Sequence, residues 1–172
     1  LGKSQEKVFE FGPVDIDINR NEIIFITGSN GSGKSTFINL LSGLYQPKAG
    51  ALYMNGIKVD GENSSYYRNQ FAAIYTSAYL FNDNYNDFNL KDDERKINKY
   101  VEKMKLTDKI RIINEKGIID SKLSKGQQKR VAMIYALMEE KEVFIFDEWA
   151  AEQDPKFRIF FYTEFLPELK RD

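Results

Sequence analysis

The sequence of 172 residues contains neither cysteine nor histidine. Without cysteine the chain forms no disulfide and no thiolate site, which fits a reducing compartment. It has no apolar run long enough to cross a bilayer and no stretch with the features of a secretory signal. Neither sign of charge dominates, because 25 basic residues face 26 acidic ones, so electrostatics gives no reason to expect nucleic acid as the main partner. The first residue is Leu1, and we expect the chain to be a piece of a longer product.

The composition that remains is that of a globular domain, with 42% hydrophobic and 30% charged residues over a length sufficient for one core. The patterning of the first half predicts antiparallel strands over 8–11 and 14–18, a hairpin turning at Asn55-Gly56, a short helix or turn over 66–70 and a strand over 71–75. Further along the chain it predicts a surface loop over 82–89, an amphipathic helix over 92–104 and a helix over 156–166. The stretch 110–119 is ambiguous between strand and loop.

Residues 28–36 read Gly-Ser-Asn-Gly-Ser-Gly-Lys-Ser-Thr and match the phosphate-binding loop pattern without a mismatch. The apolar run 22–27 before this loop predicts a buried parallel strand, and residues 37–41 after it predict a helix that ends near Gly43. A strand, a glycine loop and a helix in this order are what phosphate binding needs. The alternative is a glycine-rich turn without a ligand.

The chemistry of this loop favours a nucleotide. Its glycines let backbone N–H groups turn toward a β-phosphate, and the helix N-terminus adds partial positive charge. Lys34 can reach the β- and γ-phosphates, and the Ser35 hydroxyl can bind Mg²⁺. We therefore predict that ATP and Mg²⁺ are the cofactors and that the nucleotide-binding residues are Ser29, Asn30, Gly31, Ser32, Gly33, Lys34, Ser35 and Thr36.

A second motif is acidic. The apolar strand predicted over 143–146 is followed by Asp147 and Glu148. Asp147 at the end of such a strand can hold Mg²⁺, and Glu148 can orient or deprotonate the water that attacks a γ-phosphate. We predict Asp147 as a metal ligand and Glu148 as the catalytic carboxylate. The alternative is an acidic pair that caps a helix.

A third motif, Leu-Ser-Lys-Gly-Gln at 123–127, starts a predicted helix with apolar residues at Val131, Ile134, Tyr135 and Met138. With this motif the chain resembles the ATP-binding domain of ABC ATPases, whose signature is Leu-Ser-Gly-Gly-Gln; Lys125 replaces the first of its two glycines. A serine and backbone N–H groups at a helix N-terminus form an anion site. The resemblance implies that Ser124, Lys125, Gly126 and Gln127 act in trans, on ATP bound to another copy of the domain. A serine N-cap without a ligand is the alternative.

The resemblance covers nearly the whole chain. Residues 151–154, Ala-Glu-Gln-Asp, fall where the family has its D-loop, and the sequence over 147–155 is similar to that of bacterial exporters of cyclic peptides, peptide antibiotics and peptide siderophores. The resemblance implies an α/β P-loop fold of ABC type over 1–172, with a mostly parallel core sheet, an antiparallel β subdomain and a helical subdomain inserted at about 82–135. The implied partners are a second copy in an ATP-dependent head-to-tail dimer, a transmembrane domain of the same exporter and, through it, a peptide-like cargo. The implied location is the cytoplasmic face of the inner membrane. Nucleic acid is not among the implied partners.

The chain departs from the family pattern in places. Thr76 stands where the family has a glutamine that contacts Mg²⁺, so it is a weaker candidate metal contact. Phe9 or Phe11 is a candidate for stacking on adenine, although either can be a core residue. The family's switch histidine follows a later strand, and the chain stops at Asp172 before it, so we expect the fragment alone to hydrolyse ATP poorly. The alternatives are a soluble ABC-type ATPase of DNA repair or translation, and a small P-loop kinase.

Overall fold

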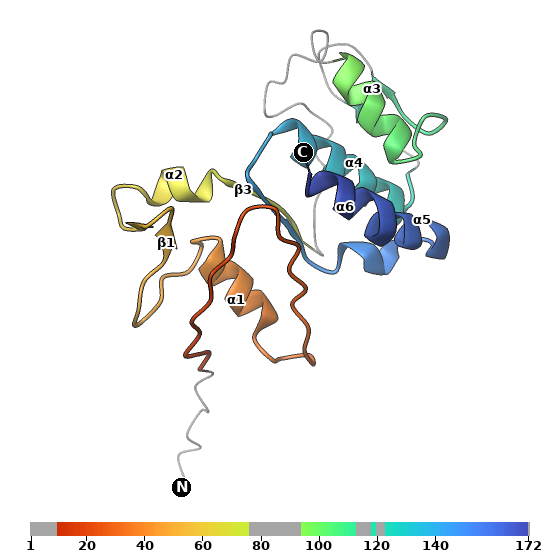
Figure 1. Ribbon diagram of the computed structural model, residues 1–172. Coiled ribbons are helices and arrows are strands. Elements are labelled where there is room, and N and C mark those ends of the chain that lie inside the picture. Colours follow the sequence, from red (N-terminus) through yellow and green to blue (C-terminus); the bar gives the residue numbers. More distant parts are fainter. Residues whose placement is uncertain (1–9, 76–93, 113–117, 120–122, 172) are drawn as a thin grey trace, which may run out of the picture.

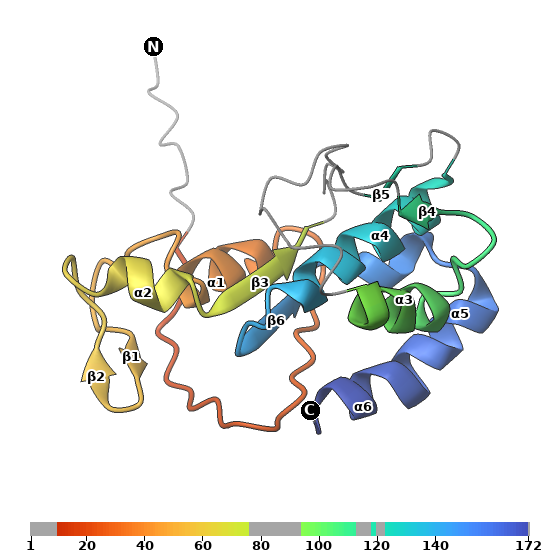
Figure 2. The same ribbon diagram turned by 90° about the horizontal axis from the view of Figure 1, so that it is seen from above.

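The computed structural model describes residues 10–75, 94–112, 118–119 and 123–171 (Figures 1 and 2). Phe9, Thr76 and the predicted loop over 82–89 lie outside these residues. In the described part, no helix is both long enough and apolar enough to cross a membrane.

Helix α1, Lys34–Leu41, begins inside the phosphate-loop motif and includes the helix predicted over 37–41. The helix ends at Leu41, and Gly43 just beyond it has a φ of 73° and donates its N–H to the carbonyl of Leu40 at 3.0 Å. The next N–H, of Leu44, donates to the carbonyl of Asn39 at 2.9 Å. These two bonds form the glycine-ended helix terminus that the sequence indicated, because glycine adopts a positive φ without steric cost.

A hairpin and a short helix follow α1. Strands β1, Tyr53–Met54, and β2, Ile57–Lys58, pair antiparallel across the predicted Asn-Gly turn. Helix α2, Ser64–Arg68, then leads to the central strand. Its buried Tyr67 donates its hydroxyl to the carbonyl of Leu41 at the end of α1, which fixes α2 against that helix.

Two parallel strands form the centre of the fold. Strand β3, Phe71–Ile74, pairs with β6, Val143–Phe146, in a register that sets Phe71 opposite Val143 and Ile74 opposite Phe146. Figure 2 shows the two strands side by side, with α1 next to β3 and α4 over the pair. The prediction of two apolar strands at 71–75 and 143–146 is confirmed.

The predicted buried strand over 22–27 is wrong in this structure. The segment has no strand pairing among the described residues, and Phe25 is 66% exposed. Residues 10–11 and 14–18 form no strand either, so the predicted antiparallel pair there is also wrong where it is described. An apolar run exists as a strand only when a partner supplies ladder hydrogen bonds, and among the described residues no segment supplies them to 22–27.

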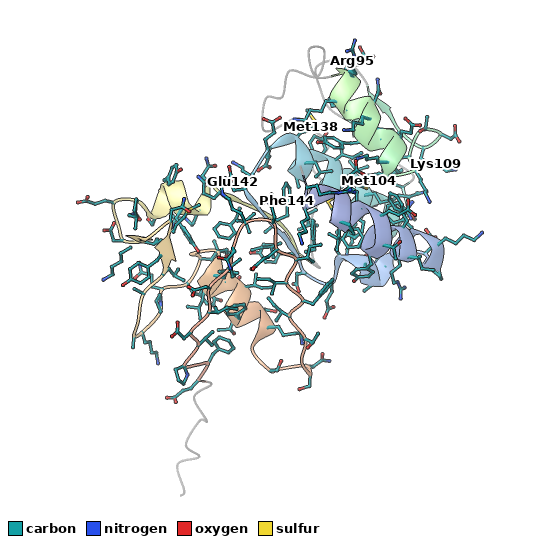
Figure 3. All side chains as sticks on the ribbon, in the orientation of Figure 1. Arg95, Met104, Lys109, Met138, Glu142 and Phe144 are labelled. Carbon is teal, nitrogen blue, oxygen red and sulfur yellow. The ribbon has the colours of Figure 1, made fainter. Side chains whose placement is uncertain are left out.

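Helices cover the strand pair. Helix α3, Glu94–Lys103, and helix α4, Lys125–Met138, pack on each other through buried residues that include Ile97, Val101 and Ile134. Met104, fully buried after α3, lies where α3 approaches α4 and the C-terminal helices (Figure 3). Strands β4, Arg111–Ile112, and β5, Ile118–Ile119, pair antiparallel, so within the ambiguous stretch 110–119 these four described residues are strand.

The C-terminal part is helical beyond its predicted end. A 3-10 helix, η2, Trp149–Glu152, is followed by α5, Pro155–Phe160, a π-helical turn η3, Phe161–Phe165, and α6, Leu166–Leu169. The helix passes Pro167 because proline at the start of α6 needs no intrahelical N–H bond, and the wider π turn precedes it.

Candidate nucleotide-binding site

The phosphate loop turns through two glycines with positive φ, Gly31 at 77° and Gly33 at 94°. The N–H of Ser32 donates to the carbonyl of Ser29 at 3.2 Å, which closes a tight turn. Gly33 is the N-cap of α1 and supplies no side-chain cap. The first N–H groups of α1 are thus left without a side-chain acceptor, and this is where a helix attracts an anion.

Lys34 folds back over this loop. Its ammonium donates to the carbonyls of Gly28 at 2.8 Å and Ser29 at 3.0 Å. The two bonds hold a positive charge beside the uncapped helix end. A side chain at position 28 would disturb this arrangement, because a Cβ on Gly28 would lie 2.6 Å from the Ser32 hydroxyl oxygen. The loop is therefore closed around its own lysine.

An open pocket of about 300 Å³ adjoins the loop. It is lined by Phe11, Val14, Ile26, Thr27, Ser32, Lys34 and Phe37. The rings of Phe11 and Phe37 lie 5.9 Å apart at 42°. Phe11 is half-buried and lines the same cavity as Lys34, so of the two candidate adenine-stacking residues it is the one the structure describes next to the loop.

The acidic pair lies at the end of β6. The N–H of Asp147 donates to the carbonyl of Ile74 at 3.0 Å, which carries the parallel ladder one residue further. Glu148 is exposed and has a φ of 49°, a conformation that few non-glycine residues adopt. Its side chain leaves the strand at the point where the chain turns into η2, so its carboxylate is accessible from solvent.

The donor atoms fit a magnesium ion chemically. The Ser35 hydroxyl, in the first turn of α1, and the Asp147 carboxylate are oxygen ligands, which Mg²⁺ prefers together with phosphate oxygens and water. The described residues contain no group of three or more acidic or other metal-binding side chains, so this part of the chain offers no all-protein cage. Figures 1 and 2 show α1 beside β3, which pairs with β6, the strand that the acidic pair follows.

The signature segment begins α4 with a capping box. The Ser124 hydroxyl accepts from the N–H of Gln127 at 3.3 Å, and the Gln127 side chain accepts from the N–H of Ser124 at 2.9 Å. The predicted helix start is confirmed. Ser124 and Lys125 are exposed, whereas Gly126 is buried. The two exposed residues are accessible to a partner, and the buried glycine faces the interior.

The residues that follow Glu148 pack against this helix end. A Cβ on Gly126 would lie 2.7 Å from the carbonyl oxygen of Glu152, so the backbone of the D-loop residues rests directly on α4. Sequence reasoning did not single out Arg130, on α4, or the role of Gln153, although both are buried and polar, which is unusual. No motif in the sequence indicated that they meet.

The family model described as ABC transporter matches residues 11–151. The chain belongs to this family. It is an ATP-hydrolysing domain of the ABC type, and its fold is that of a P-loop NTPase with mixed α and β structure. Domains of this family bind ATP with Mg²⁺.

Relatives and solved structures agree with this family. The chain is 38% identical over 169 residues to the ATP-binding protein SyrD of Pseudomonas syringae pv. syringae, covering 95% of this chain and 29% of SyrD. It is 32% identical over 155 residues to the energy-coupling factor transporter ATP-binding protein EcfA1 of Ureaplasma parvum serovar 3, covering 83% of this chain and 51% of that protein. The chain thus spans between about a third and about half of these relatives.

Two solved structures share the fold. CbiO1 from Clostridium perfringens, part of the ABC transporter complex CbiONQ, superposes with a TM-score of 0.71 at 24% identity, over 92% of this chain and 66% of that one. A bacterial Atm1-family ABC exporter with ATP bound has a TM-score of 0.60 at 25% identity, over 74% of this chain and 24% of that one. Membership of this family makes the chain an ABC-type ATPase rather than a small P-loop kinase.

Proposed function

We propose that this chain is the nucleotide-binding domain of an ABC exporter and drives export of a peptide-like substrate across the bacterial cytoplasmic membrane. The supporting observation is the combination, in one chain of this family, of a phosphate loop closed by Lys34 and a capped signature helix. The similarity in fold to an Atm1-family ABC exporter, with a TM-score of 0.60 at 25% identity, supports the exporter type.

In this proposal each residue has one task. Lys34 gives up its bonds to the loop carbonyls and binds the β- and γ-phosphates, while the uncapped N–H groups of α1 hold the same anion. Ser35 and Asp147 bind Mg²⁺, which neutralises developing phosphate charge. Glu148 orients the attacking water and accepts its proton. Ser124 faces the nucleotide of a second copy, so each site is completed in trans.

The phosphate loop is tested by Lys34→Ala. Losing a charge-assisted contact of this kind costs about 2–5 kcal/mol, so most MgATP binding is expected to disappear. Calorimetric titration measures the affinity. The matched control is Lys58→Ala, which removes an exposed lysine on β2 and is expected to bind like wild type. Equal affinities of wild type and Lys34→Ala contradict the assignment.

Catalysis is tested by Glu148→Gln in the full-length gene product. The variant keeps its shape and binds ATP, but hydrolysis is expected to slow on the order of a hundredfold, and an ATP-bound dimer is expected to accumulate. Glu142→Gln, an exposed carboxylate beside β6 that pairs with Arg20, is the control and retains turnover. Unchanged turnover of Glu148→Gln means that another group positions the water.

The cargo class is tested separately. The full-length protein in membrane vesicles is expected to release phosphate faster when a cyclic peptide is supplied, and to move a labelled peptide only with hydrolysable ATP. ATP turnover that no peptide stimulates, with no peptide movement, retains the ATPase assignment and rejects the peptide cargo.

A further inference from the structure

Two buried polar side chains link the signature helix to the D-loop residues. Gln153 is 3% exposed and Arg130 is 8% exposed. Burying a polar group lowers the stability of the fold unless each of its polar atoms forms a hydrogen bond. A buried polar pair such as this one therefore indicates a specific hydrogen-bonded arrangement rather than nonspecific packing.

Both the NH₂ group and the carbonyl oxygen of the Gln153 side-chain amide form hydrogen bonds with residues of α4. Its Nε2 donates to the carbonyl of Gly126 at 3.1 Å, and its Oε1 accepts from Nε of Arg130 at 2.8 Å. Gly126 and Arg130 are four residues apart, so they lie on one face of the helix. The amide therefore spans one helical turn and fixes the D-loop in both position and rotation relative to α4.

Arg130 extends the connection to two further elements. Its guanidinium donates to Oδ2 of Asp154 at 2.6 Å and to the carbonyl of Met104 at 3.4 Å, and it lies 3.5 Å from the centre of the Phe157 ring. Asp154 caps α5 through a bond from the N–H of Phe157 at 2.9 Å. The end of α3, the start of α5 and the signature end of α4 thus meet on one side chain.

Two more contacts hold the same surfaces together. The indole N–H of Trp149 donates to the carbonyl of Lys129 at 3.1 Å, and the ammonium of Lys129 lies 3.3 Å from a carboxylate oxygen of Glu152. The glycine at 126 lets the backbone of Glu152 approach without a Cβ between them. Residues 149–154 and the first two turns of α4 therefore form one packed unit, which includes the signature residues.

We propose that Gln153 is a positioning residue that sets where the signature residues Ser124 and Lys125 stand relative to the D-loop. The unit moves as one piece, so nucleotide bound by a second copy meets the signature and the D-loop in a fixed relation. This inference rests on the proposed function of Ser124 in trans. It gives Gln153 a role without contact to the nucleotide.

Gln153→Met tests the proposal, because methionine keeps the length and bulk of the side chain and removes both hydrogen bonds. In a Glu148→Gln background, ATP affinity of the monomer is expected to stay within about twofold, since the phosphate loop is a separate element. ATP-dependent dimerisation, followed by light scattering, is expected to weaken about tenfold or more, because small losses of positioning are costly at such sites. Gln70→Met, which removes a side-chain bond to the carbonyl of Tyr66, is the matched control and changes neither quantity.

Gln153→Glu separates the two bonds. Glutamate still accepts from Arg130, which keeps the fold, but it presents an oxygen to the carbonyl of Gly126. Dimerisation is expected to weaken here too, with monomer ATP affinity unchanged. Normal dimerisation of either Gln153 variant overturns the proposal, and so does a parallel loss of ATP binding. If the Glu148→Gln parent itself fails to dimerise with ATP, the sandwich model of the proposed function is what fails.

Discussion

Replacing Gly126 by alanine adds one methyl group at the closest approach between the signature helix and the D-loop. The new Cβ would lie 2.7 Å from the carbonyl oxygen of Glu152, a distance that real Cβ atoms essentially never show. That oxygen belongs to the backbone and cannot rotate away as a side chain can. The D-loop or the helix end must therefore move.

The expected cost follows from two opposing effects. Overpacking of this kind costs about 1–3 kcal/mol. Alanine favours the helix more than glycine does and restricts the conformations of the unfolded chain. These two effects stabilise the folded state by about 0.5–1 kcal/mol. We expect Gly126→Ala to be less stable by about 1–2 kcal/mol, and the melting temperature to fall by roughly 2–4 °C for each kcal/mol.

The stabilities of Gly126→Ala and Gly61→Ala, measured by chemical and thermal denaturation, are compared to isolate the effect of the contact between position 126 and the Glu152 carbonyl oxygen. Gly61 has open space around its Cβ position, and its φ is not in the positive range, so this control keeps the benefit of alanine without a clash. The control is expected to be as stable as wild type or slightly more stable. If Gly126→Ala unfolds at the same temperature as Gly61→Ala or above it, the close approach of the D-loop backbone is refuted.

Three further predictions concern separate parts of the fold. Ser124→Arg is expected to leave ATP binding to the monomer intact and to block ATP-dependent dimerisation in light scattering; a normal dimer counts against the sandwich model. A hydrogen bond from the N–H of Phe157, and then contacts with Arg130, lower the pKa of the exposed Asp154, and desolvation opposes them only in part. The charge of Asp154 therefore stabilises the fold at neutral pH. The difference in free energy of unfolding between wild type and Asp154→Asn, measured with urea, should thus have its full size above about pH 4 and shrink as the pH falls below the ordinary aspartate pKa of about 3.9. A difference that does not depend on pH refutes this. Tyr67→Phe is expected to cost about 1 kcal/mol in the same assay, because a carbonyl at the end of α1 loses its donor, and an unchanged stability means that water replaces the hydroxyl.

The elements that the sequence predicted correctly carry their own local signals. The hairpin over 53–58 follows from an Asn-Gly turn, the end of α1 from Gly43, and the start of α4 from the serine at its N-cap. Each depends on the conformation of one or two residues and needs no distant partner. The phosphate loop is of the same kind, since its glycines and lysine lie within nine residues.

The elements that sequence reasoning missed depend on partners far along the chain. The run 22–27 has the composition of a buried strand, but no described segment pairs with it, and composition does not specify which segments pair. The bonds of Gln153 to residues on α4 cross more than twenty positions and leave no periodic trace. The inserted helical subdomain over 82–135 and the roles of the site residues stay predictions.

Trp149 is the one tryptophan of the chain, and its surroundings make it an optical reporter. Its ring is 1% exposed, lies 4.4 Å from that of Phe161, and donates its N–H to the signature helix. A buried indole that water does not contact fluoresces at short wavelength, and its emission maximum shifts to longer wavelength when water reaches the ring. The emission of the unlabelled protein therefore reports, at one position between the acidic pair and α4, whether these two parts separate when nucleotide arrives.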